Sequence, residues 1–202
     1  MIIAFIITTV ATLTCILFYD KTIAIEMSRL PLNYSLLHRL SNDIPDTLLL
    51  IVCIITVFAS VCYMTRRKTG IFDNKTLLFR LIMYAVPVAY LVKTLLKYVF
   101  GRITTREWLI RPDLYGFHWF RGVGYYGGFP SGHMMVFTAL AMILWRFYPM
   151  YRVAYASFLT VLGFSLVATD YHFLSDVIAG AYCGAIVEIC TYEVLKRREW
   201  KR

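Results

Sequence analysis

The sequence predicts an all-α membrane protein whose transmembrane helices form one bundle. Three observations predict it. Hydrophobic residues make up 59% of the 202 residues, charged residues make up only 16%, and the apolar residues gather in long runs. Soluble domains carry about 25% charged and about 45–50% apolar residues, so a soluble domain of this size could not bury the excess. A lipid bilayer can accept it.

Six of these runs approach the roughly 20 apolar residues that cross about 30 Å of hydrocarbon. The runs do not alternate as the strands of a membrane barrel do, so we expect six helices. The first run lacks a basic segment before it and is expected to be retained as a span. All five cysteines lie inside the runs without zinc or disulfide spacing, which favours a packing role. The expected spans are residues 2–19, 47–64, 77–99, 134–150, 153–170 and 177–195.

The net charge of +9 raises the possibility of nucleic-acid binding, but the basic residues form short clusters between the runs. That pattern is typical of cytoplasmic loops and excludes the basic stripe of a nucleic-acid binder. Three clusters alternate correctly along the chain if both termini are cytoplasmic. They are Arg66, Arg67, Lys68 and Lys75, then Arg146 and Arg152, then Lys196, Arg197, Arg198, Lys201 and Arg202.

The opposite side of the membrane is then expected to hold residues 20–46, 100–133 and 171–176. The first of these contains leucines around Pro31 and predicts an interfacial helix. Residues 100–133 carry four arginines and seven of the eleven glycines. Arginines kept on the translocated side indicate an anionic ligand, and glycine allows a loop to close around it. The alternative is a flexible loop with stray charges.

The string GGFPSGH at residues 127–133 predicts a helix N-terminus directly before the fourth span. Ser131 is a typical N-cap residue, so the helix would begin at Gly132 with His133 in its first turn. A helix N-terminus offers unpaired N–H groups and partial positive charge, which together bind anions. The alternative is a plain capped helix with an interfacial histidine.

The string DYHFLSD at residues 170–176 precedes the sixth span. His172 and Asp176 are four residues apart and share a face on a helical turn. A carboxylate beside an imidazole fixes its tautomer, which frees the other ring nitrogen to act as a nucleophile. The alternative is an interfacial histidine, with Asp176 stabilising the helix start. The charge pattern used neither histidine, yet it places His133 and His172 on the same side.

Two lysines, Lys93 and Lys97, lie one helical turn apart near the end of the third span. Intramembrane lysines are costly and usually face a polar cavity, although Lys97 is near enough to the interface to snorkel. Lys93 lies deeper, and a structural role is open for it. We therefore expect Lys93→Ala to lower activity much less than Lys97→Ala.

In chain order, the string KTLLKYVFGR at residues 93–102, which holds both lysines, and the two histidine strings resemble the type 2 phosphatidic acid phosphatase superfamily, also called lipid phosphate phosphatases. The resemblance covers about residues 75–195 of a single membrane domain spanning 1–202. The motif Pro-Ser-Gly-His is complete at residues 130–133, and Ser165 precedes His172 and Asp176 at the family spacing. Two positions depart from the family pattern. Thr104 and Thr105 stand where the family has Arg-Pro, and Leu166 stands where it has arginine.

The resemblance implies a phosphohistidine mechanism without metal or other cofactor. His172 would attack phosphorus, Asp176 would orient it, and His133 would protonate the leaving oxygen and later activate water. The phosphoryl oxygens would be held by Lys97, Arg102 or Arg106, Ser131 and the Gly132 N–H. Arg106, Arg111 and Arg121 are the candidates to replace the arginine absent at Leu166.

The expected substrate is a lipid phosphate or diphosphate at the outer face of a bacterial inner (plasma) membrane, which faces the periplasm or exterior. Undecaprenyl diphosphate, phosphatidylglycerol phosphate, phosphatidic acid and lipid A phosphates all fit, and the partners would be membrane lipids, not nucleic acid. The oligomeric state is left open. Two alternatives remain: phosphotransfer to a second lipid through the same intermediate, and a lipid-binding protein that has lost turnover, which Leu166 favours.

Overall fold

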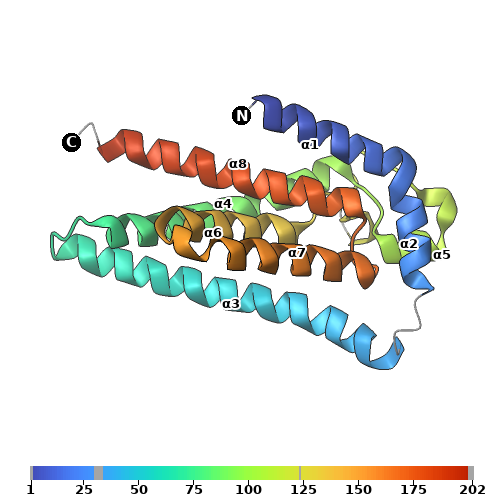
Figure 1. The fold of residues 1–202 in the computed structure, drawn as a ribbon, viewed down its shortest axis with the longest axis horizontal. Coiled ribbons are helices and arrows are strands. Elements are labelled where there is room, and N and C mark those ends of the chain that lie inside the picture. Colours follow the sequence, from blue (N-terminus) through green and yellow to red (C-terminus); the bar gives the residue numbers. More distant parts are fainter. Residues whose placement is uncertain (1, 30–33, 123, 200–202) are drawn as a thin grey trace.

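The computed structural model describes residues 2–29, 34–122 and 124–199, with the side chains of 34–46, 198 and 199 excepted. The regular secondary structure of the described residues is helical, and their one β feature is an isolated bridge between Arg102 and Phe117. Figure 1 shows the elongated bundle that the long helices form. The α-helices are α1 (Ile2–Thr14), α2 (Asp20–Ser28), α3 (Tyr34–Lys68), α4 (Asn74–Phe100), α5 (Thr105–Ile110), α6 (Gly132–Phe147), α7 (Arg152–Ala168) and α8 (Leu174–Glu199).

A π-helical turn, η1 (Cys15–Tyr19), joins α1 to α2, so residues 2–28 run as one interrupted helix. The N–H of Asp20 bonds to the carbonyl of Cys15, five residues back. Such a widened turn is a recognised cause of helix kinks. The chain changes direction here, and α2 turns down across the end of the bundle (Figure 1). Short 3₁₀ turns form the remaining elements: η2 (Pro112–Leu114), η3 (Gly124–Tyr126) and η4 (Pro149–Tyr151).

Helix α6 lies at the centre of the bundle, in contact with α4, α7 and α8. Its first ten residues, 132–141, are all buried. Two glycines of α8, four residues apart, bring α8 against α6. A β-carbon at Gly180 would come within 2.4 Å of the Ser131 carbonyl oxygen, and one at Gly184 within 2.3 Å of the Met135 carbonyl oxygen. Small residues at this spacing let membrane helices approach closely.

Five helices are long and apolar enough to cross a membrane: Ile2–Ser28, Thr47–Lys68, Asn74–Phe100, Pro149–Ala168 and Leu174–Arg197. They correspond to five of the six expected spans. The sixth, expected at 134–150, corresponds to α6, whose 16 residues extend only about 24 Å because a 3₁₀ turn at Pro149 follows it. The count of six therefore stays a prediction. On the outer faces of α1 and α3, exposed apolar side chains suit contact with lipid.

The expected interfacial helix falls in residues 20–46, of which 30–33 lie outside the described residues. On either side of this gap, α2 continues the first helix and α3 begins at Tyr34. Helix α3 then runs without a break for 35 residues into the second expected span. Whether α2 or the start of α3 lies along a bilayer surface stays a prediction.

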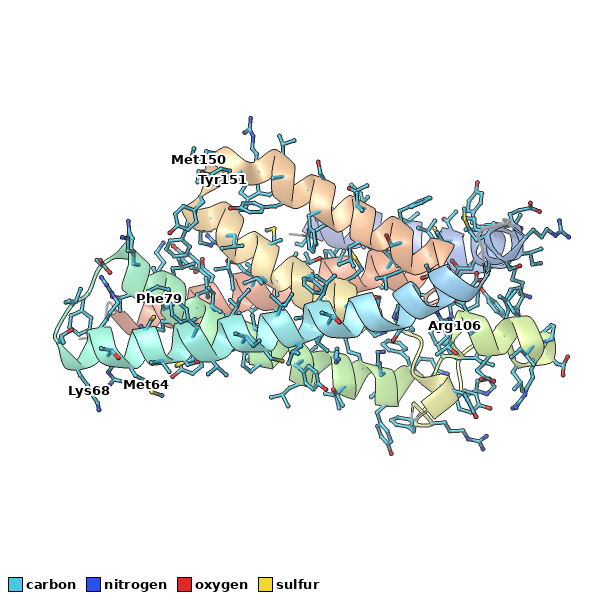
Figure 2. All side chains as sticks on the ribbon, turned by 90° about the horizontal axis from the view of Figure 1, so that it is seen from below. Met64, Lys68, Phe79, Arg106, Met150 and Tyr151 are labelled. Carbon is cyan, nitrogen blue, oxygen red and sulfur yellow. The ribbon has the colours of Figure 1, made fainter. Side chains whose placement is uncertain are left out.

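The loop residues cluster at the two ends of the bundle. Figure 2 shows Arg106 near one end and Lys68, Met150 and Tyr151 toward the other. At the Arg106 end, the segment after α4 folds back onto it through backbone bonds. The N–H of Phe120 donates to Val99 O at 2.9 Å, and that of Gly128 donates to Arg102 O at 2.8 Å. This ordered segment lies over the ends of the helices that carry the expected site.

Candidate active site

The N-termini of α6 and α8 meet at the Arg106 end of the bundle. The Ser131 N–H, at the start of α6, donates to the Asp176 carbonyl in the first turn of α8 at 2.9 Å. The close approach at Gly180 holds the same two backbones together one turn further along α8. The two strings that carry the expected histidines are thus joined by a direct backbone bond.

Ser131 caps α6 as its sequence predicts, and the helix begins at Gly132. The Ser131 hydroxyl accepts from the Met134 N–H at 3.4 Å, which satisfies one donor of the first turn. His133 follows in that turn, with 9% of its surface exposed. Its ring stands edge-on to the Tyr171 ring at 5.4 Å between centroids.

His172 lies in the turn between α7 and α8. The Leu166 carbonyl accepts from the N–H groups of both Tyr171 and His172, at 3.0 and 3.1 Å, which fixes the turn. The Tyr171 ring also lies 5.4 Å from the His172 ring. Because Tyr171 contacts both imidazoles, His133 and His172 lie on one side of the bundle, within electrostatic reach of each other.

The His172 ring is almost fully buried, with 2% of its surface exposed. Its Nδ1 lies 3.6 Å from Asp176 Oδ2, an ion-pair distance that is too long for a hydrogen bond. Neither ring nitrogen has a hydrogen-bond partner among the described residues. Burial lowers the pKa of His172, Asp176 acts in the opposite direction, and Lys97 lowers the pKa further. The net lowering favours the neutral imidazole that a nucleophile requires.

Asp176 is fully buried and its two carboxylate oxygens have different partners. Oδ1 accepts from the Arg102 guanidinium at 2.5 Å. Oδ2 accepts from the Phe173 N–H at 3.0 Å and faces the His172 ring. The carboxylate is therefore fixed on one side and turned toward the imidazole on the other.

Arg102 has no exposed surface and makes several polar contacts. Besides Asp176, its guanidinium donates to Asp20 at 2.7 Å, to the Ser175 hydroxyl at 2.6 Å and to the Tyr115 hydroxyl at 3.1 Å. Burial lowers the pKa of Arg102, but the two carboxylates outweigh burial and hold it above its ordinary value. These partners differ from the phosphate contact expected from sequence, because the guanidinium is already engaged by protein groups.

Three other cations surround the two imidazoles. Lys97, in the last turn of α4, is close enough to His172 to lower its pKa. A β-carbon at Gly132 would come within 2.7 Å of Lys93 Cδ and 3.4 Å of its Nζ, so Lys93 runs along the N-terminus of α6. From α5, Arg106 donates to the Thr169 carbonyl at 3.2 Å and lies 5.1 Å from the centre of the Tyr171 ring. Both Lys93 and Arg106 therefore reach the site.

Other residues of the family pattern lie away from the histidines. Ser165 is exposed, and its hydroxyl donates to the Val161 carbonyl within α7. Leu166 is 1% exposed and packs in the main hydrophobic core. Arg111 and Arg121 are exposed. Of the three candidates to replace the missing arginine, Arg106 is the one that the structure brings to the histidines. Among the described residues, no three His, Cys, Asp or Glu side chains gather as metal ligands.

Sequence reasoning missed Asp20 and gave Lys93 a lesser role than its position indicates. Asp20 was missed because it lies far from the motif strings, although a carboxylate directly after an apolar run was a signal. Lys93 was expected to matter less than Lys97 because it lies deeper, yet its long side chain reaches the α6 N-terminus. The close helix approach was also readable, because Gly180 and Gly184 form a GxxxG pattern in an apolar run.

Comparison with known proteins gives a consistent picture. Two curated relatives are named lipid A 1-phosphatase. The one from Rhizobium johnstonii is 32% identical over 122 residues, covering 57% of this chain and 47% of the relative. The one from Rhizobium etli is 33% identical over 113 residues, covering 53% and 46%. The chain spans about half the length of the curated relatives it matches. No solved structure matches the chain.

The family comparison covers the part of the chain that carries the site. The PAP2 superfamily matches residues 77–200, more than half of the chain. All three motif strings, including His133, His172 and Asp176, fall within this range. With its apolar helices, the chain is an integral membrane protein. It belongs to the PAP2 superfamily, the family that its motifs resemble.

Proposed function

We propose that this protein hydrolyses the phosphate ester of a membrane lipid through a phosphohistidine intermediate. One observation carries the proposal: two buried imidazoles, one of them beside a fixed carboxylate, meet where two helices begin. Helix N-termini and nearby lysines favour an anion at this place. Phosphoryl transfer depends mainly on positioning and on neutralising charge, and this arrangement supplies both.

In the first half-reaction, the neutral Nε2 of His172 attacks phosphorus and the bond between phosphorus and the lipid oxygen breaks. Asp176, which faces Nδ1 of the same ring, stabilises the positive charge that develops on the imidazole. His133, in its protonated form, donates a proton to the leaving lipid oxygen. The products are the dephosphorylated lipid and a phosphohistidine at His172.

In the second half-reaction, water attacks the phosphohistidine. His133, now neutral, accepts the proton of the attacking water, and the bond between phosphorus and His172 breaks. Inorganic phosphate leaves and both imidazoles return to their starting states. One residue can serve as acid and then as base because each half-reaction reverses its protonation.

The phosphoryl oxygens are held by the N–H groups of the α6 first turn and by three cations: Lys93, Lys97 and Arg106. Lys93 lies against Gly132, the first residue of that turn. Arg106 and Tyr171 are half-buried, so they are more exposed than the histidines. Arg106 supplies a guanidinium in place of the arginine that the family has at the position of Leu166. Because Arg106 is more exposed than the histidines, the lipid headgroup enters the site past it.

The first candidate substrate is lipid A carrying its 1-phosphate, because both relatives are named lipid A 1-phosphatase. Undecaprenyl diphosphate, phosphatidylglycerol phosphate and phosphatidic acid share the same phosphate chemistry. They form the other arms of the substrate panel. The active face is the outer one, where the charge pattern places the ends of α6 and α8 that carry the site.

The test measures phosphate release from this panel by the purified protein in detergent, with and without a metal chelator. We expect His133→Ala and His172→Ala each to lower the rate by at least about 10²-fold, the scale of lost acid–base or nucleophilic help. His118→Ala is the matched control. His118 lies in the segment between α4 and α6, where its ring contacts the Leu114 carbonyl and the Tyr126 ring and, among the described contacts, neither of the two expected histidines. This variant should keep the wild-type rate. Equal rates from wild type and His172→Ala would refute the catalytic assignment.

A further inference from the structure

Asp20 is a buried carboxylate outside the region that matches the family. It lies at the junction of η1 and α2, whereas the match begins at residue 77. Its surface is 1% exposed. A carboxylate is costly to bury in or near a membrane unless it is paired and serves a purpose, so its partners identify its role.

The partners of Asp20 all come from the site. Oδ1 accepts from the backbone N–H of Ser175 at 3.0 Å. Oδ2 accepts from the Ser175 hydroxyl and from the Arg102 guanidinium, the latter at 2.7 Å. Ser175 is the residue before Asp176, and Arg102 is the side chain that holds Asp176. Asp20 therefore contacts both the backbone next to Asp176 and the arginine that binds the Asp176 side chain.

Arg102 stands between two carboxylates, with Asp20 on Nη2 and Asp176 on Nη1. Its positive charge is shared between them, so Asp176 is held in place without being fully neutralised. If Asp176 were the only partner of Arg102, more of its negative charge would be compensated. Less of that charge would then remain to stabilise a positive His172 ring in the transition state.

The position of Asp20 is fixed by the local fold. The π-helical turn bends the chain directly before it, and the Ile16 carbonyl in that turn accepts from the Tyr115 hydroxyl at 2.7 Å. Nearby, Ala24 of α2 packs in a cluster with Trp108 and Phe173. The Phe173 ring lies 4.6 Å from the Arg102 guanidinium carbon. The N-terminal helix is thus docked on the same aromatic cluster that encloses Arg102.

We infer that Asp20 is a positioning residue for the reaction, acting through Arg102 and Ser175 to hold Asp176 against His172. The N-terminal helix then completes the active site and is more than a membrane anchor. This inference rests on the proposed function, since it assigns a role to Asp20 within the same reaction.

The test compares Asp20→Asn with Glu26→Gln. Glu26 lies on the same helix α2, but it is exposed and pairs only with Arg29 at the surface among the described contacts. Both changes remove one negative charge and keep the side-chain size. We expect Asp20→Asn to lower kcat by about 10- to 100-fold with little change in KM, the scale seen when a group that orients a catalytic residue is lost. Glu26→Gln should keep both constants.

A double-mutant cycle separates positioning from a merely structural role. If Asp20 acts through Asp176, then adding Asp20→Asn to Asp176→Asn should lower kcat much less than it does in the wild type. The inference is overturned by a wild-type kcat in Asp20→Asn, by equal effects of the two charge removals on α2, or by additive losses in the cycle.

Three further outcomes bear on the inference. If Asp20→Asn does not fold, Ser175→Ala takes its place, because it removes only the hydroxyl between Asp20 and Arg102. A several-fold lower kcat at an unchanged melting temperature supports the inference, and a wild-type kcat overturns it. If wild type and His172→Ala release phosphate equally, the proposed function fails and the inference fails with it. If His172→Ala is inactive but Asp20→Asn keeps the wild-type kcat, only the inference fails.

Discussion

Helix α8 carries two fully buried carboxylates, Asp176 near its start and Glu188 further along, and each pairs with an arginine. Glu188 is bound by both arms of Arg146 from α6: Oε1 accepts from Nε at 2.8 Å and Oε2 from Nη2 at 3.0 Å. The Arg146 side chain is one-third exposed and also lies 3.8 Å from the centre of the Tyr192 ring. Both oxygens of Glu188 are therefore satisfied by one partner.

Asp176 differs because Arg102 takes only one of its oxygens, and the other is turned toward His172. Arg102 also binds Asp20, whereas Arg146 makes a bidentate pair with Glu188. The comparison indicates how the same chemical pair serves two purposes. A bidentate pair ties α6 to α8, and a divided pair leaves charge available to a neighbouring ring.

The largest expected effect comes from comparing two single variants, each of which replaces one of the two carboxylates with an amide. Asp176→Asn should lower kcat by at least about 10²-fold, because the amide can no longer stabilise a positive His172 ring. Glu188→Gln should leave kcat within about twofold and instead lower the free energy of unfolding by about 1–3 kcal/mol, since a buried charged hydrogen bond is lost. Phosphate release and thermal melting in detergent measure the two quantities. Similar kcat losses in both variants would break the comparison.

The part of this difference that sequence could predict is the local part. The spacing of His172 and Asp176 on one helical face, the Ser131 cap and the membrane helices follow from rules that act over a few residues. The structure has the Ser131 cap and five helices long and apolar enough to span a membrane, and it brings His172 to 3.6 Å from Asp176 from a turn just before α8. Family resemblance added which residues to look for, and its motifs are the ones that the family match includes.

What sequence could not predict depends on contacts between distant segments. Arg102 was expected at the phosphate, but Asp20, 82 residues earlier, reaches it because a π-helical turn bends the first helix. No local pattern encodes that meeting. Lys93 was assigned a lesser role by depth alone, and only the packing of α4 against α6 places it along Gly132. The partner of Arg146 on α8 was hidden for the same reason.

The next largest effect concerns the two lysines of α4. They lie at the end of the bundle that holds the Asp176–Arg102 pair, whereas the Glu188–Arg146 pair lies toward the opposite end. Because Lys93 runs along the α6 N-terminus, we expect Lys93→Met to raise KM by about tenfold, contrary to the lesser effect that its depth predicts from sequence. Lys97 lies closer to His172, the proposed nucleophile, so Lys97→Met should lower kcat by about 10- to 100-fold. Steady-state kinetics on one lipid phosphate separates the two constants. Arg146→Met, at the opposite end, should alter neither, and an unchanged KM in Lys93→Met would exclude that lysine from the phosphate site.

The smallest expected effect is a shift in pH dependence, and it tests the divided pair directly. In the proposed mechanism His172 must be neutral to attack, so activity should fall as the pH drops through its pKa. Burial lowers that pKa below the ordinary value of 6.5, and Asp176 partly opposes the lowering. Removing the carboxylate therefore moves the acidic limb of kcat/KM to still lower pH in Asp176→Asn, measured from its residual rate in single turnovers. The ionisation of the substrate is the same for every variant, so it does not contribute to the difference. Glu188→Gln leaves the limb where it is in the wild type, since both its oxygens face Arg146. A limb that moved to higher pH in Asp176→Asn would show that another group supports the nucleophile.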